Sequence, residues 1–324
     1  MNRIGDIILL NVLAPNIIVV VRSYGNVAAG GEHAGFWFET PGQRAFIDLG
    51  AFDDNSAHSM AFFGFTSYPP GWQPIHEARI SNLKVYRNMR NGMFLHVTRN
   101  LYFTGGLIAD NGWNAVFILQ GDSITFEGTK IIGVTSNEIG KPPHCGVLGP
   151  LEKGLILHPA KIQELNYTGI VKGTSLIDVE FINFAPETSG CIEGADALSF
   201  SSSHVTRPTF DAPHSFSNVI FEEGTDPLDA CPLEDEHGLD DIIIEIIEET
   251  HGSFSTEAQP GFLVSPKFSI FAAEEPCNPY STCLDFCPDT CMRTLRFLTN
   301  SLADDYDMMV TDGATELTLT RKQR

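Results

Sequence analysis

The sequence predicts an all-β chain that winds into a right-handed parallel β-helix. Three observations lead to this prediction: a repeat with a constant offset of 23 residues, short apolar runs separated by Asn, Gly or Asp, and a composition rich in turn-forming and aromatic residues. With 43% hydrophobic and 19% charged residues, the chain is typical of a globular protein. Its 29 Gly, 19 Pro and 23 Phe favour strands with frequent corners.

The repeat begins at Leu83, and a shift of 23 residues aligns seven pairs of similar residues. The pairs are Val85 and Ile108, Asn88 and Asn111, Asn91 and Asn114, Phe94 and Phe117, Leu101 and Ile124, Phe103 and Phe126, and Gly105 and Gly128. Each copy holds apolar runs of three to five residues, which have the length of strands and are too short for helices. Three strands and three corners make one rung of a coil of the pectin-lyase-like kind.

Such a coil places each side chain above its equivalent in the next rung. We therefore expect Phe94 over Phe117 as part of an interior stack. We expect Asn88 over Asn111 at a corner, because Asn tolerates left-handed backbone and can bond to the neighbouring rung.

An earlier copy of the rung is present, but at a different spacing. The segment that starts at Ala28 matches the segment that starts at Val85, an offset of 57 residues, which is not a multiple of 23. We interpret the difference as an insertion near residues 40–79, which are rich in Pro, Gly and His. Dividing the chain length by the period, with an allowance for loops, then gives about ten rungs.

The domain organisation follows from the extent of the repeat. We expect the β-helix to cover residues 1–300, with a cysteine-containing segment at residues 277–291, and residues 301–324 to form a tail or a truncated continuation. No run of 18 apolar residues is present, so the sequence predicts no membrane-spanning helix.

The charge limits the classes of partner. The chain has 20 Lys and Arg against 41 Asp and Glu, a formal net charge of -21. Such a chain repels nucleic acid and anionic lipid at long range, so we expect neither as a partner. Screening at physiological salt removes most of this repulsion beyond about 8 Å, so a local basic group can still bind an anion.

The cysteines favour disulfides. Four of the seven are clustered, with a spacing that lacks the paired C-x2-C knuckles of zinc sites. These are Cys277, Cys283, Cys287 and Cys291. Disulfides in an oxidising compartment are the preferred interpretation, and reduced structural thiols are the alternative.

Several segments resemble a known family. Residues 26–39 (NVAAGGEHAGFWFE) resemble a signature in the parallel β-helix region of the cell-migration-inducing hyaluronidase, its transmembrane relative and the fibrocystin-like proteins. Residues 52–59 resemble the F-x-(D/N)-N-x-A-H-S stretch of the same proteins, and the cluster at 277–291 resembles their cysteine-bearing segment. The similarity covers residues 15–300. It implies an extracellular or cell-surface location, with any membrane attachment through a flanking anchor. The catalytic residues of the family lie upstream of the matched stretch, so none carries over.

The signature residues have a structural interpretation and a functional one. We expect most to hold corners, although a Glu-His pair could also serve as acid and base. They are Asn26, Gly30, Glu32, His33, Gly35, Trp37 and His58. The oxygens of residues 53–55 leave Ca2+ binding open as an alternative to an Asx turn, but no metal or other cofactor is predicted.

The candidate ligand-binding and catalytic residues are few. Arg87 and Arg90 could hold an anionic glycan through bidentate contacts, and Trp72, beside a Pro-Pro-Gly corner, is expected to be exposed and to stack on a sugar. Trp37 is expected to be buried. Asp110 and Asp122 are the candidate carboxylate pair for glycoside hydrolysis, with solvated corner acids as the alternative.

These observations favour one function over another. Asn166 begins the one N-glycosylation sequon, which a secreted chain would place at an exposed corner. We expect a non-catalytic extracellular module that serves as a rigid scaffold for a glycan or an extracellular protein. The alternative is an enzyme that cleaves hyaluronan or another uronic-acid polysaccharide by hydrolysis or elimination.

Overall fold

A computed structural model gives the fold of the chain. It describes residues 7–9, 22–38, 48–68, 71–119, 121–133, 135, 153–157, 172–184, 196–200, 214–223, 225, 228–229, 247–251, 253–254, 259–264, 277–279, 285–288, 307–311 and 316–320. These residues form strands, turns and bends, and no α-helix occurs among them. The chain divides into two compact units, Met1–Cys291 and Met292–Arg324, which are described separately.

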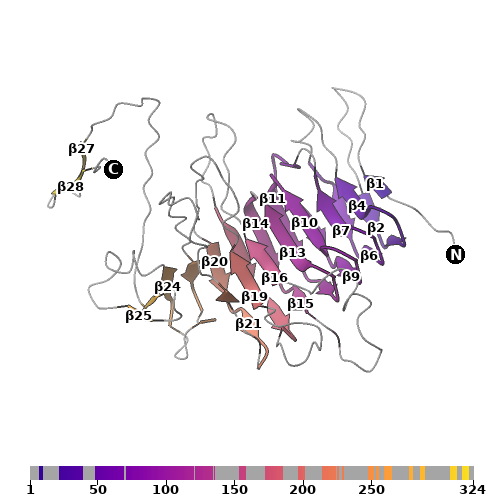
Figure 1. Cartoon of the computed structure of the whole chain (residues 1–324). Coiled ribbons are helices and arrows are strands. Elements are labelled where there is room, and N and C mark those ends of the chain that lie inside the picture. Colours follow the sequence, from indigo (N-terminus) through magenta and orange to yellow (C-terminus); the bar gives the residue numbers. More distant parts are fainter. Residues whose placement is uncertain are drawn as a thin grey trace, which may run out of the picture. The chain divides into compact units, whose positions relative to one another are not determined.

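The first unit is built from three sheets whose strands recur in strict rotation (Figure 1). Sheet A contains β1 (Ile7–Leu9), β4 (Ala34–Phe38), β7 (Phe63–Ser67), β10 (Met93–His96), β13 (Asn114–Leu119), β16 (Lys153–Leu157), β19 (Asp196–Phe200) and β22 (Leu228–Asp229). Sheet C contains β3 (Val27–Ala29), β6 (Ser56–His58), β9 (Lys84–Tyr86), β12 (Leu107–Ala109), β15 (Lys130–Ile132), β18 (Glu180–Ile182) and β21 (Ile220–Phe221).

Sheet B lies between these two along the chain and ends in a different arrangement. Its parallel strands are β2 (Arg22–Tyr24), β5 (Ala51–Asp53), β8 (Ala78–Ser81), β11 (Arg99–Thr104), β14 (Asp122–Glu127), β17 (Thr174–Ile177), β20 (His214–Ser217) and β23 (Ile247–Glu249). Its antiparallel strands are β24 (Gly261–Val264), β26 (Asp285–Pro288) and β25 (Asn278–Pro279). The second unit holds one antiparallel pair, β27 (Asp307–Thr311) and β28 (Glu316–Thr320).

From β1 to β23, paired strands in all three sheets are parallel and lie three places apart in the chain. This rotation through three sheets is the connectivity of a parallel β-helix, so the predicted fold class is confirmed. The 23-residue offset is the length of one rung, because β10 pairs with β13 so that Phe94 lies opposite Phe117.

The orientation expected for that pair is wrong. Phe94 and Phe117 are partly exposed, whereas Leu95 and Ile118, which follow them, are buried. Successive side chains of a strand point to opposite faces, so Phe94 and Phe117 stand on the outer face of sheet A. The strand Met93–His96 carries large apolar groups on both faces, so its sequence does not show which face is inside.

The expected insertion near residues 40–79 is instead largely a further rung. Residues 51–67 contribute β5, β6 and β7, one strand to each sheet. Ala28 pairs with Ala57, and Ala57 pairs with Val85, so the 57-residue offset spans two rungs of 29 and 28 residues. These rungs are longer than 23 residues because more chain connects sheet A to sheet B in them.

The interior of the coil is filled by columns of side chains from successive rungs. In sheet B, Phe103 stacks on Phe126 with ring centroids 4.8 Å apart, and both rings are buried. At the N-terminal end of the coil, Phe36, Phe52 and Phe65 make edge-on contacts in the same interior. Each buried ring removes a large apolar area from water, and this burial is the main stabilisation of the coil.

The corners between strands repeat as regularly as the strands. Asn88 accepts a bond from the Met60 amide, and Asn111 accepts bonds from the amide and the side chain of Asn88. Gly105 and Gly128 have φ values of 64° and 60°, a left-handed conformation that glycine adopts without strain. The predicted stacking of Asn88 over Asn111 at a corner is therefore confirmed, and the aligned pair Gly105 and Gly128 occupies another corner.

The C-terminal end of the coil is closed by the antiparallel strands of sheet B. Leu263 of β24 is fully buried against the coil, and Phe286 of β26 belongs to the same core. A disulfide joins Cys277 to Cys287, so disulfide formation within the predicted cluster is confirmed for this pair. The other two cluster members, Cys283 and Cys291, and the sequon at Asn166 lie outside the described residues. In the described part of the chain, no helix has the length and apolarity to cross a membrane.

Candidate functional site

The burial of Trp72 and of Trp37 is the reverse of what the sequence predicted. Trp72 is 0% exposed, its ring stacks on Phe38 at 4.5 Å, and its amide donates to Ser67 Oγ at 2.8 Å. The connection from β7 to β8 thus turns its tryptophan into the coil, so the prediction of an exposed, sugar-stacking Trp72 is wrong. Trp37 is partly exposed rather than buried, because it points outward between the inward-facing residues Phe36 and Phe38.

The candidate carboxylates Asp110 and Asp122 lie at different corners. Asp110 follows β12 at the corner from sheet C to sheet A, whereas Asp122 opens β14 in sheet B. The six residues of β13 separate them, and an extended strand of that length spans roughly 17 Å. Hydrolysis by a carboxylate pair requires about 5–9.5 Å, so these two groups do not form such a pair.

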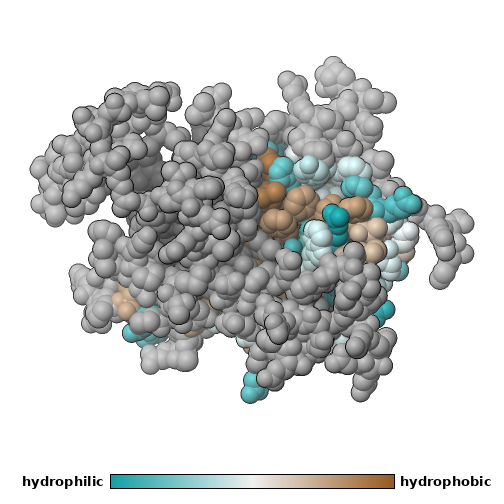
Figure 2. Space-filling view, in the orientation of Figure 1, coloured by the Kyte–Doolittle hydropathy of each residue, from teal (hydrophilic) through white to brown (hydrophobic). Residues whose placement is uncertain are grey.

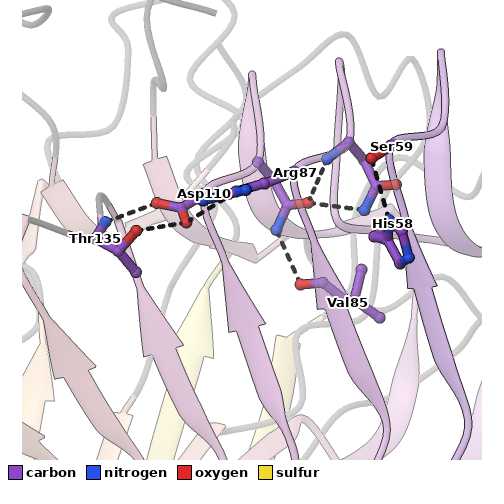
Figure 3. Close-up of polar contacts among 8 residues, drawn as sticks. His58, Ser59, Val85, Arg87, Asp110 and Thr135 are labelled. Carbon is purple, nitrogen blue, oxygen red and sulfur yellow. Dashed lines mark hydrogen bonds and ion pairs between the residues drawn. The ribbon is translucent and has the colours of Figure 1, made fainter. Parts of the chain in front are cut away.

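Each of these carboxylates is instead held by its own neighbours. Asp110 accepts bonds from the amide and the hydroxyl of Thr135, at 2.6 and 2.7 Å, and lies 3.9 Å from Arg87 Nε (Figure 3). Asp122 lies 3.5 Å from Arg99 Nε in a buried pair, and its burial raises the pKa of its carboxyl despite that cation. Both contacts join neighbouring rungs, so their evident role is to hold corners.

The signature residues hold a turn and a close approach. The Asn26 amide and side chain both donate to Asn55 Oδ1, at 3.0 and 3.2 Å. Gly30 has a φ of 72°. A Cβ on Gly35 would lie 2.5 Å from Ala57 Cβ, so only glycine fits at that point of the coil. Glu32 is exposed at the same corner.

His58 lies in sheet C beside the signature segment, where it pairs with Ala29 and its carbonyl accepts the Gly30 amide at 3.3 Å. Its Nδ1 is 3.1 Å from Ser59 Oγ (Figure 3), and its ring stacks on Tyr86 at 4.8 Å. The described residues contain no group of three His, Cys, Asp or Glu side chains that could hold a metal ion. The Ca2+ alternative at residues 53–55 therefore gains no support, since Asn55 is buried in the corner while Asp54 points to solvent.

The basic residues of the repeat do not converge on one site. Lys84 is exposed on sheet C, Arg99 is in the buried pair described above, and Arg87 is at the corner beside Asp110 with 45% of its side chain exposed. Arg90 has different surroundings. Its guanidinium carbon lies 4.2 Å from the ring centroid of Phe62.

Arg90 is part of a column of planar groups at the corner that leads into sheet A. The column consists of His33, Phe62, Arg90 and Trp113, one from each of four successive rungs. The rings of His33 and Phe62 are stacked at 5.2 Å, and the guanidinium of Arg90 lies over Trp113 at 4.6 Å on its other side. We call these four residues the stacked column. Each member is partly exposed.

Further aromatic rings extend from the stacked column across the outer face of sheet A. Phe63 stacks on Phe94 at 5.2 Å, Phe94 contacts Phe117 at 5.5 Å, and Tyr68 contacts Phe94 at 5.7 Å. Trp37 joins the first rung by stacking on His33 at 4.7 Å. Figure 2 shows hydrophobic residues gathered over the part of the unit where Figure 1 shows β10 and β13.

The geometry of the column determines what it can bind. The rings of His33 and Phe62 are stacked at an interplanar angle of 20°, so they cover one another's faces, and the edge of an aromatic ring carries partial positive charge. The guanidinium of Arg90 lies near the rings of both Phe62 and Trp113, and its N–H donors form a planar fork that matches a carboxylate. The ion pairs of the described residues involve His76, Arg79, Arg87, Arg99 and Lys130, and none involves Arg90.

Sequence reasoning identified Arg90 as a ligand-binding residue but missed its ring partners. Phe62 lies 28 residues before Arg90 and Trp113 lies 23 residues after it, so a single period does not connect all three. Allowing the rung length to vary between 23 and 29 residues would have aligned the column.

Comparison with known proteins adds little to this description. No protein-family model matches the sequence, and no curated protein matches it. Among solved structures, the chain is similar to the A-module of the mannuronan C-5 epimerase of Azotobacter vinelandii, with 13% identity and a TM-score of 0.27. The match covers 64% of this chain and 61% of that module. A similarity this low carries no argument, so the fold rests on the strand pairing of the chain itself. The resemblance to the hyaluronidase family stays a prediction.

Proposed function

We propose that this chain is a rigid β-helix module that binds an acidic glycan on the outer face of sheet A and does not cleave it. One observation carries the proposal: the guanidinium of Arg90 is clamped between Phe62 and Trp113, and no acidic partner is found for it among the described residues.

The clamp supports recognition of a carboxylate. Stacking on two rings contributes about 0.5–2 kcal/mol per contact and holds the side chain in one orientation, so less rotamer entropy is lost when a ligand binds. The neighbouring ring edges favour the hydroxyl oxygens of a sugar over an apolar partner. These are the groups that a uronic acid offers.

The overall charge of -21 opposes an acidic ligand only at long range. Ions screen most of this repulsion beyond about 8 Å at physiological salt, whereas a bidentate contact to Arg90 acts at about 2.8 Å. We therefore expect binding through short contacts with a slow association rate, because no attractive field steers the ligand.

The extracellular setting is part of the proposal. The disulfide between Cys277 and Cys287 supports it, because disulfides persist in oxidising compartments. The absence of cleavage is supported by the separation of Asp110 and Asp122, each of which is engaged with a neighbouring rung.

Calorimetry with a matched pair of ligands tests the binding function. A uronic-acid oligosaccharide should bind, and its carboxyl-reduced counterpart should bind at least tenfold more weakly. Arg90→Gln should lower affinity for the acidic ligand by about 10- to 100-fold, which corresponds to the 1.5–3 kcal/mol of a charged hydrogen bond. Arg79→Gln is the control, since Arg79 lies over Tyr102 at 4.5 Å but pairs with Glu77 at 2.8 Å. Equal binding of the two ligands, or no effect of Arg90→Gln, would contradict the proposal.

A second measurement separates binding from catalysis. We expect hyaluronan and pectic polymers incubated with the protein to keep their chain length. If the wild type shortened these polymers and the Asp110→Asn variant did not, the proposal of a non-catalytic module would be wrong, and the protein would be a polysaccharide-cleaving enzyme.

A further inference from the structure

We propose that the ligand is an extended linear polysaccharide that lies along the coil axis, with one sugar ring over each rung of the stacked column. This inference rests on the proposed glycan-binding function and adds the shape, direction and minimum length of the ligand. The polymer contains carboxylates, because Arg90 in the stacked column has no acidic partner among the described residues.

The spacing of the stacked column fits such a ligand. Its three successive separations are 5.2 Å, 4.2 Å and 4.6 Å. They follow from the distance between paired strands, about 4.8 Å, because each member comes from the next strand of the sheet. An extended chain of pyranose sugars advances by nearly the same distance per residue, so successive sugars would meet successive rungs without a change of register.

Partly exposed planar groups follow one another along the coil axis more closely than across sheet A. Along the axis, a ligand meets four partly exposed planar groups in four rungs, beginning at His33 and ending at Trp113. Across the sheet, within the rung of Arg90, it meets the buried residues Asn91 and Met93 before the next outward ring, Phe94. The run of contacts is therefore longer along the axis.

The charge of Arg90 lies inside the stacked column rather than at either end of it. Arg90 is the third of the four members, so it can bind the carboxylate of one sugar while ring edges lie beside sugars on both sides. His33 lies two strand spacings from Arg90, roughly 10 Å. A disaccharide anchored on Arg90 can reach Phe62 or Trp113, but it cannot reach His33.

An oligosaccharide length series tests this arrangement. We expect affinity to rise by about 2- to 10-fold for each added sugar up to four and then to level off, because each sugar gains one ring contact. His33→Ala should weaken binding of the tetrasaccharide by about 2- to 10-fold and leave binding of the disaccharide unchanged. Arg90→Gln should weaken binding at every length.

The control for a lost ring is His58→Ala. His58 stacks on Tyr86 at 4.8 Å in the same way, but on sheet C, so its removal should change binding at no length. Circular dichroism and thermal unfolding of each variant establish that the coil remains folded.

The outcomes separate this inference from the function on which it rests. If no acidic oligosaccharide binds, the proposed function fails. If binding depends on Arg90 but is equal for two and six sugars, or if His33→Ala weakens short and long ligands alike, the function stands and the alignment along the axis is wrong.

Discussion

Two pairs of phenylalanines have the same 23-residue separation and face opposite ways. Phe103 and Phe126 in sheet B are buried, with parallel rings 4.8 Å apart, whereas Phe94 and Phe117 in sheet A are partly exposed, with rings tilted by 48° at 5.5 Å. The inner pair belongs to a buried column that continues on both sides, with Ile80 paired to Phe103 and Leu176 paired to Phe126. The difference shows that the repeat determines which residues stack, while burial determines whether a stack stabilises the coil or is available to a ligand.

The largest effect should come from the inner pair. Phe126→Ala should lower the free energy of unfolding by about 3–5 kcal/mol, because the truncation leaves a cavity between packed rungs. Phe117→Ala should lower it by no more than about 1 kcal/mol, since solvent already reaches that ring. Denaturant unfolding of both variants measures the contrast. Equal losses would mean that the outer stack is part of the structural core.

Acid should weaken the interior through His214. This imidazole is buried, its Nδ1 accepts the Thr174 amide at 3.0 Å, and desolvation lowers its pKa to about 4. The unfolded chain has a histidine pKa of about 6.5 and binds the proton first, so stability is full above pH 6.5 and falls as the pH drops towards 4. The free energy of unfolding should fall by about 3 kcal/mol over this range, because each tenfold difference in proton affinity between the two states contributes about 1.4 kcal/mol.

Unfolding curves between pH 7 and 4 test this expectation against two variants. His214→Asn, which keeps an acceptor for the amide, should flatten the pH dependence. His251→Asn, at an exposed position, should leave it unchanged. A wild-type profile that His214→Asn does not alter would assign the acid sensitivity to other groups.

Substitutions at the corners of the coil should lower the free energy of unfolding by a smaller amount. Gly128 has a φ of 60°, and a Cβ added there would meet no atom closer than 4.0 Å, so Gly128→Ala tests backbone strain alone. We expect a loss of about 1–2 kcal/mol for Ala, and less for Asn, which tolerates this conformation. Thermal unfolding is sufficient to rank the two substitutions. No difference between them would show that the corner relaxes to another conformation.

Much of the fold could be predicted because equivalent positions in successive rungs of a solenoid recur at a regular spacing in the sequence. The 23-residue offset gave the register of Phe94 with Phe117 and the corner ladder of Asn88 with Asn111. The first rungs were harder, because their connections from sheet A to sheet B add five or six residues and hide the period. The sequence therefore predicted an insertion where residues 51–67 form three strands of a rung.

The candidate site was harder to predict than the fold. Which tryptophan is buried depends on the path of a connection, and the Pro-Pro-Gly sequence before Trp72 marks a corner without giving the direction of the ring. Arg90 was identified from charge alone, whereas its clamp needs two rings from rungs of unequal length. The pairing of Cys277 with Cys287 could not be chosen among the possible pairings of four cysteines.

The reversal of strand direction at β24 has a consequence for how the protein behaves in a crowded solution. A parallel coil offers its last strand as a template, and identical chains could add to it without limit, as they do in amyloid. Here β23 pairs with an antiparallel strand, which is followed by β26 and the disulfide-linked β25. In sheet B, the last parallel strand is thereby paired with a segment of its own chain, so it does not offer its edge as a template to a second copy.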